Sequence, residues 1–286
     1  MMKKMMIILG AAAMMSVCAG VALAGPDPGT GIYESVHDLT NGPGGAGAPL
    51  SVPGFVTDPQ QRLCAYCHTP HHAIQPGDPN AGTADYLPLW SHDVSTVNYT
   101  PYVSATFTPL GGQSMAADPL TGPSRLCMSC HDGITAVDNY YGLQNNHVMI
   151  NNPGAPFTGQ PVINANGNTN HPLGFAMSDV IPQYPGATNP DNANILALTN
   201  SSTYVTGLGT SNTTIVSRLY FGAIMTCASC HDVHNTLNHV SYQSGAGNFL
   251  LLGTQKNSGI CLSCHTQGGG DNGLAHTSVP DAAFTY

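Results

Sequence analysis

The sequence predicts a chain built mostly of irregular coil, with short α-helices around four copies of one short motif and little β structure. Two observations carry this prediction. The 286 residues include 33 glycines and 22 prolines, which recur too often for long helices or a regular sheet. The pattern Cys-x-x-Cys-His also occurs four times, beginning at Cys64, Cys127, Cys227 and Cys261.

These four motifs match the attachment signature of c-type haem. At the Cys and His frequencies of this chain, chance would give on the order of one copy per hundred such chains. In a helical turn, positions i, i+3 and i+4 share a face, so two thiols can bond one porphyrin edge while the imidazole binds the iron. The predicted cofactors are four covalent haem c groups. The predicted thioether residues are Cys64, Cys67, Cys127, Cys130, Cys227, Cys230, Cys261 and Cys264, and the predicted proximal iron ligands are His68, His131, His231 and His265.

Zinc binding is the alternative interpretation of paired cysteines with a histidine. A zinc site combines two such pairs and does not need a histidine at the same place four times. Of the nine cysteines, eight lie in the motifs and Cys18 lies near the N-terminus. No thiol remains for a disulfide framework, so haem thioether bonds are the expected covalent staples.

Residues 1–24 are predicted to be a signal peptide. Two lysines precede the apolar run Met5–Met15, and small residues ending at Ala24 offer a cleavage site. The run is too short to remain as a spanning helix, and stable membrane insertion is not expected. Cys18 raises the alternative of a lipid-modified N-terminus. The mature chain is expected to be secreted, extracellular or on the outer cell surface, with the periplasm as the alternative.

The mature chain is poor in charge and acidic. Charged residues make up 7% of the sequence, against roughly a quarter in ordinary soluble domains. After residues 1–24 are removed, fifteen acidic residues face four basic ones, so nucleic acid is not an expected partner. Few charges would need desolvation at a contact between copies of the chain. This composition has two interpretations: a surface suited to self-association, or simply a loop-rich extracellular protein.

Residues 25–286 are predicted to form a single tetrahaem domain, of which 25–56 are a Gly/Pro-rich extended arm. Asp58, followed by Pro59, predicts the start of a capped helix that leads into the first motif. Ser124 and Ser258 are expected to cap the helices of the second and fourth motifs.

A longer helix is predicted over Thr214–Thr226, before the third motif, from its spacing of apolar residues. Residues 145–214 are interpreted as loop. The motif starts are 63, 100 and 34 residues apart, so 227–265 form a doubled motif unit. Because the mature chain is long for four haems, we expect it to sheathe an extended row of them.

Residues just after the proximal histidines are also informative. Nine other histidines are present, more than the four sixth ligands required, so bis-histidine ligation is expected throughout. His71 and His234 each lie three residues after a proximal histidine, and each is placed to bind a neighbouring haem. For His71, an exposed loop position is the alternative and His72 is the rival ligand. Asp132 and Asp232 are expected to close turns, with a hydrogen bond to the imidazole as the alternative.

Several landmarks resemble the exported multihaem c-type cytochromes of metal-reducing bacteria, among them outer-surface tetrahaem members that polymerise into filaments. Residues 227–265 look like the doubled motif unit common in that family, whereas 145–214 match only at His171. The matching runs are His37-Asp38-Leu39, Cys64–His71, Pro88-Leu89-Trp90, Arg125–Gly133 and His171–Phe175. The resemblance implies a multihaem cytochrome c fold with the distal iron ligands His37, His71, His171 and His234, and with His72 and His92 as reserves.

The resemblance also implies a function. It points to extracellular electron transport, rather than an enzymatic reaction, by the subunit of a polymeric cytochrome filament. The implied partners are copies of the chain itself, other cytochromes or extracellular electron acceptors. A monomeric periplasmic or outer-surface shuttle and a nitrite- or hydroxylamine-type reductase with one open haem are the alternatives. The filament hypothesis predicts that His37, on the arm, binds a haem of the next subunit.

Overall fold

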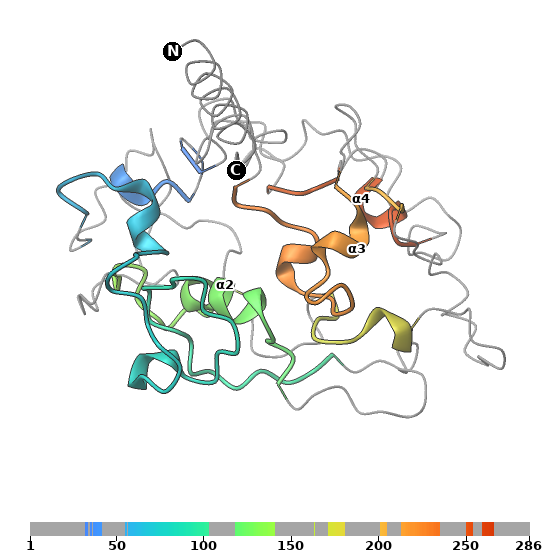
Figure 1. The fold of residues 1–286 in the computed structure, drawn as a ribbon, viewed down its shortest axis with the longest axis horizontal. Helices are drawn as coiled ribbons and strands as arrows, with labels where there is room; N and C mark the ends of the chain where they lie inside the picture. Colours follow the sequence, from blue (N-terminus) through green and yellow to red (C-terminus); the bar gives the residue numbers. More distant parts are fainter. Residues whose placement is uncertain are drawn as a thin grey trace, which may run out of the picture.

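The structure is a computed structural model (Figure 1). It describes residues 32–33, 35, 37–41, 55, 57–102, 118–140, 163, 171–180, 201–204, 213–234, 250–253 and 259–265. The predicted signal peptide, most of the arm, Ser258 and most of residues 145–214 lie outside the described residues.

The described residues form short helices separated by turns and coil. The helices are η1 (Leu39–Asn41), η2 (Leu63–Tyr66), η3 (Pro79–Ala81), α2 (Pro123–His131), η6 (Met177–Asp179), α3 (Ile215–Arg218), η8 (Cys227–Ser229) and α4 (Gly259–Leu262), where η marks a 3-10 helix. Five isolated β-bridges join pairs of described residues, and no strand longer than these is formed within the described ranges. None of the described helices is long and apolar enough to cross a membrane. The multihaem cytochrome fold itself stays a prediction.

The helix predicted to begin at Asp58 is wrong. Gln61 has φ of +51°, which no α-helix accommodates, so the chain makes a turn and η2 begins only at Leu63. The Asp58 carboxylate closes this turn. It accepts hydrogen bonds from the amide and guanidinium of Arg62, at 2.8 to 2.9 Å. Asp58 therefore shapes the entry to the first motif without capping a helix.

Replacing Asp58 with asparagine should lower the free energy of unfolding by about 1 kcal/mol at neutral pH, a small loss because the Arg62 side chain is 40% exposed and screened. Hydrogen bonds from Arg62 hold the Asp58 pKa at about 2, below its ordinary 3.8. The carboxylate therefore stabilises the fold above about pH 4, and this contribution is lost as pH falls towards about 2. Unfolding titrations of both proteins should converge over that range, and a pH-independent difference would contradict the assignment.

Helix α2 begins with a glycine and a proline, not with the predicted serine cap. Gly122 has φ of +56°, and a Cβ there would lie 2.8 Å from the ring of Tyr220, so both conformation and space require glycine. Pro123 occupies the first helical position, as is common. Ser124 instead lies buried within the helix, and its hydroxyl accepts a hydrogen bond from the Cys227 amide at 3.0 Å. This contact joins the second motif to the third.

Replacing Ser124 with alanine should cost about 1 kcal/mol of stability, because the Cys227 amide would lose its acceptor. Chemical denaturation monitored by circular dichroism would measure the loss. Ser217→Ala is the matched control, since Ser217 is an exposed serine whose hydroxyl bonds the Thr214 carbonyl at 2.7 Å. Equal losses in the two variants would argue against the link between motifs.

The helix predicted over Thr214–Thr226 is only one turn long. Thr214 caps α3 by accepting a hydrogen bond from the Ser217 amide at 3.3 Å. The helix then ends, because Leu219 is extended and Phe221 has φ of +52°. Tyr220 and Ile224 exchange backbone hydrogen bonds of 2.9 and 3.0 Å. The apolar residues that suggested a helix therefore form a tight turn that leads to the third motif.

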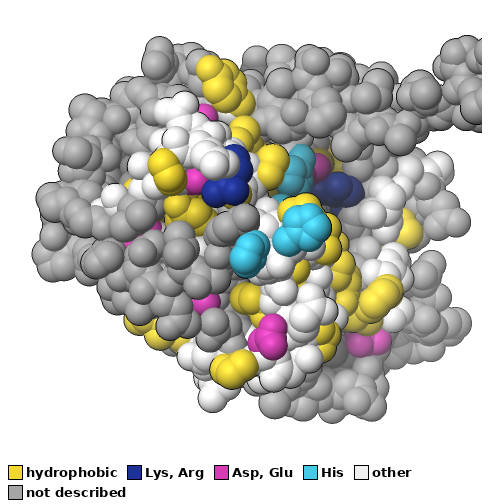
Figure 2. All heavy atoms as spheres, turned by 60° about the vertical axis from the view of Figure 1, so that its left-hand side comes forward, with side chains coloured by type: hydrophobic (Ala, Val, Ile, Leu, Met, Phe, Trp, Pro, Cys, Tyr) yellow, Lys and Arg dark blue, Asp and Glu magenta, His cyan; other side chains and the backbone are white. Residues whose placement is uncertain are grey.

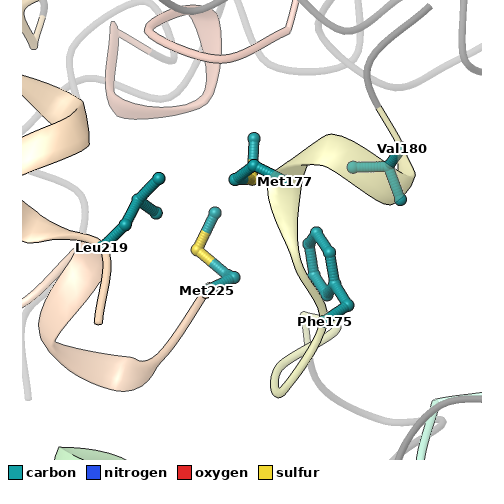
Figure 3. Close-up of a cluster of buried hydrophobic side chains, with 5 residues drawn as sticks. All are labelled: Phe175, Met177, Val180, Leu219 and Met225. Atoms are coloured by element: carbon teal, nitrogen blue, oxygen red, sulfur yellow. The ribbon is translucent and has the colours of Figure 1, made fainter. Parts of the chain in front are cut away.

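Buried apolar side chains form several small clusters beside the motifs. One cluster joins Phe175, Met177 and Val180 to Leu219 and Met225, which point toward them from the segment before η8 (Figure 3). The buried members of three others are Trp90, Val94 and Leu126; Tyr99, Leu120 and Met128; and Tyr204, Ile215 and Leu252. Cys67 packs against the first of these, Met128 belongs to the second motif, and Cys264 packs against the last. The motifs are therefore parts of the packing and not appendages to it.

Candidate haem-attachment sites

Each Cys-x-x-Cys-His motif forms a helical turn, as its spacing predicts. The second motif lies at the end of α2. In the other three, the histidine amide donates a hydrogen bond to the carbonyl of the first cysteine: His68 to Cys64 at 2.8 Å, His231 to Cys227 at 3.0 Å and His265 to Cys261 at 2.8 Å. Such a turn brings two thiols and an imidazole to one side of the chain.

Three of the motif imidazoles, which are the predicted proximal ligands, lie beside a second imidazole from a distant part of the chain. The pairs and their centroid separations are His68 and His234 at 6.3 Å, His131 and His37 at 6.0 Å, and His265 and His171 at 6.3 Å. Two metal–imidazole bonds of about 2 Å on opposite sides of one iron would hold the centroids about 6 Å apart. The three separations therefore fit paired axial ligands of a haem iron, and all three second histidines are predicted distal ligands.

The protonation state of these rings suits metal binding. The Nδ1 atoms of His68 and His171 donate to the carbonyls of Pro88 and Pro172, at 2.7 and 2.9 Å, which leaves Nε2 available for a metal. Burial lowers the pKa of His68 and His265, and it lowers the pKa of His37 to about 3. These imidazoles are neutral at pH 7, which is the form that binds metal.

Asp232 places His234 by closing a turn. Its carboxylate accepts a hydrogen bond from the His234 amide at 2.9 Å and pairs with the Arg218 guanidinium at 3.0 Å. Burial alone would raise the Asp232 pKa, but His234 and Arg218 outweigh it and hold the pKa below its usual range. Asp132 likewise accepts hydrogen bonds from two amides that follow it, at 2.9 and 2.8 Å. Both aspartates thus have the predicted turn role.

His37 lies against a haem motif of its own chain. Its ring faces His131, and its Nδ1 atom is buried. The amide of His37 donates to the Ser35 hydroxyl at 3.1 Å, which helps to set this part of the arm. The expectation that His37 binds a haem of the next subunit stays a prediction, beside the 6.0 Å separation of its ring from that of His131 in the same chain.

The other predicted distal ligands differ in their surroundings. His71 and His72 are exposed, and exposed histidine side chains are visible on the face drawn in Figure 2. Within the described ranges His71 faces no proximal imidazole, so its role as a ligand stays a prediction. His92 is buried, and its Nε2 lies 3.5 Å from Cys130 Sγ. His92 thus contacts an attachment thiol and does not face a proximal ring.

Several buried donors beside the motifs have no hydrogen-bond partner. They are the hydroxyls of Thr69 and Ser129, the indole nitrogen of Trp90 and the Nε atoms of Arg125 and Arg218. Buried donors without partners are rare and call for an explanation. The described residues thus leave these donors without an acceptor of their own.

The second and third motifs adjoin. Helices α2 and η8 pack together, and Figure 1 shows α2 between the coil of residues 57–102 and the segment of residues 213–234. A hydrogen bond between the thiols of Cys127 and Cys227, with burial, raises the pKa of Cys127 well above its usual range. Nothing in the spacing of 100 residues between these motifs predicted that contact.

Two further findings bear on identity. Among the described residues, no three His, Cys, Asp or Glu side chains gather into a group that could hold a metal ion; the imidazoles meet in pairs. The chain matches no protein-family model and no curated protein. The functional assignment therefore depends on the motifs and on the paired rings.

Proposed function

We propose that this chain is an exported tetrahaem c-type cytochrome that transports electrons. The observation that carries the proposal is the separation of 6.0 to 6.3 Å in three imidazole pairs, each joining a motif histidine to a distant histidine. Covalently bound haem c would supply iron that alternates between the ferric and ferrous states. The paired cysteines would hold each porphyrin edge, and the paired histidines would occupy both axial positions.

Two axial imidazoles favour electron transfer over catalysis. A reductase needs a haem with an open or exchangeable axial position, and paired histidines fill that position. Bis-histidine ligation also holds the reduction potential below that of a His/Met haem. The contact between the second and third motifs supports a row of close haems, along which electrons would pass without bond chemistry on a substrate.

The proposal includes assembly into an extracellular filament of identical subunits. The low charge of the chain supports it, because few charged groups would need desolvation where copies meet. Residues 227–265 and the other landmarks that resemble filament-forming tetrahaem cytochromes support it as well. The predicted partners are copies of the chain and external electron acceptors.

One preparation tests all three candidate functions. Protein should be sheared or purified from cells that express the full chain, then analysed by mass spectrometry, oxidised-state spectroscopy and electron microscopy. We expect four haems, all low-spin, in filaments. A substantial high-spin haem would favour the reductase. Monomers alone, where the protein is abundant, would overturn the filament and leave the monomeric shuttle.

A further inference from the structure

The chain contains a structural repeat that its motif spacing hides. In the first motif, Leu89 accepts a hydrogen bond from the Thr69 amide, and Ser91 donates one to the Cys67 carbonyl, both at 2.9 Å. The residue between them, Trp90, forms a β-bridge with His68. A short segment thus lies antiparallel across the end of the motif. We call it, from Pro88 to Ser91, the first strap.

The third motif carries the same arrangement. Leu250 accepts a hydrogen bond from the Asp232 amide, and Leu252 donates one to the Cys230 carbonyl, both at 2.8 Å. Leu251 forms a β-bridge with His231. Leu250–Leu252 form the second strap. Each bond corresponds, residue for residue, to one in the first motif.

Both straps also share an unusual backbone conformation. Leu89 and Leu250, at equivalent positions, have φ of +56° and +55°. The left-handed region is unfavourable for a non-glycine residue, and such strain concentrates where the surrounding structure requires it. Two leucines in this region at matching places indicate a shared requirement.

The first strap shows what the conformation achieves. The Pro88 carbonyl accepts a hydrogen bond from His68 Nδ1 at 2.7 Å, while the next carbonyl, that of Leu89, accepts one from Thr69. In an extended strand, adjacent carbonyls point to opposite sides. The left-handed turn at Leu89 lets both carbonyls reach the same motif, one of them at the proximal imidazole.

We propose that the two straps are equivalent positioning elements for the first and third haems, and that the left-handed leucines hold them in place. This inference rests on the proposed function. A carbonyl that accepts from Nδ1 fixes the tautomer and makes the imidazole a stronger donor to the iron. Stronger donation stabilises the ferric state, so the strap lowers the potential of the haem it serves.

Leu89 offers a clean test because its side chain is 54% exposed and contributes little packing. Leu89→Gly retains the left-handed conformation, and Leu89→Val disfavours it strongly. By redox titration of the tetrahaem protein, we expect the glycine variant to keep all four potentials. The valine variant should raise one potential while all four haems stay attached and low-spin. If the valine protein does not accumulate, Leu89→Ala against Leu89→Gly makes the same comparison.

Leu250→Val should raise a second, different potential. Movement of the same potential by Leu89→Val and Leu250→Val would contradict the assignment of one strap to each haem. Unchanged potentials in Leu89→Val, or an equal shift in Leu89→Gly, would overturn the role of the backbone. Haem content distinguishes failure of the proposed function from failure of the strap proposal. A haem-free wild-type protein would overturn the proposed function. Four attached haems with unchanged potentials in the variants would overturn only the proposed role of the straps.

Discussion

Replacing His234 with alanine should leave four haems attached but convert one of them from low to high spin. The His234 ring lies 6.3 Å from that of His68, as expected of two ligands on one iron, whereas the motif cysteines would be untouched. Loss of one axial imidazole opens a coordination position. Oxidised-state absorption and electron paramagnetic resonance would measure the change, and after reduction with dithionite, added carbon monoxide should bind one ferrous haem in four.

Two matched variants sharpen this result. His234→Met should restore a low-spin haem with a raised potential, because methionine can ligate iron and raises its potential. His92→Phe should keep four low-spin haems, since His92 lies 3.5 Å from Cys130 Sγ and faces no proximal ring at the ligand separation. Four low-spin haems in His234→Ala would show that His234 is not a ligand. A high-spin haem in His92→Phe would transfer a ligand role to the buried imidazole.

Replacing all eight motif cysteines with alanine should abolish cooperative folding of the mature chain. The buried apolar side chains form small separate clusters, three of which include or contact a motif residue. Every mature cysteine lies in a motif, so no disulfide is left to restrain the chain.

Circular dichroism and thermal melting of the exported variant would measure this loss. The control is Cys261→Ala with Cys264→Ala, which removes one attachment site and should leave a folded protein with three haems. A sharp thermal transition in the haem-free chain would show that the fold does not depend on its cofactors.

The sequence predicts the structure correctly where local chemistry alone determines it. The Cys-x-x-Cys-His spacing requires a helical turn, and all four motifs form one. His234 could be anticipated because it lies three residues after His231, too close to reach the opposite face of the haem that His231 would bind. His37 and His171 could be predicted as ligands only from the resemblance to multihaem cytochromes. Their rings lie near those of His131 and His265, which are far away in the sequence.

The predictions of helix starts and ends were wrong where long-range contacts override the local sequence pattern. Apolar spacing predicted a helix through Phe221, but the helix ends at Arg218, where Leu219 becomes extended and Phe221 follows with φ of +52°. Ser124 was a sound cap candidate by residue type, yet its hydroxyl serves Cys227, a hundred and three residues away. The two straps could not be predicted from the sequence for the same reason, because their hydrogen bonds join segments about twenty residues apart. No short-range propensity encodes such pairings.

The proposed function requires four haems that are attached to this chain and held by pairs of histidines. The most direct test is electron paramagnetic resonance of the oxidised, mature protein, with haem content determined on the same sample by mass spectrometry. We expect four covalent haems per chain with low-spin ferric signals only. A chain without covalent haem, or one that carries zinc at its cysteine pairs, would contradict it.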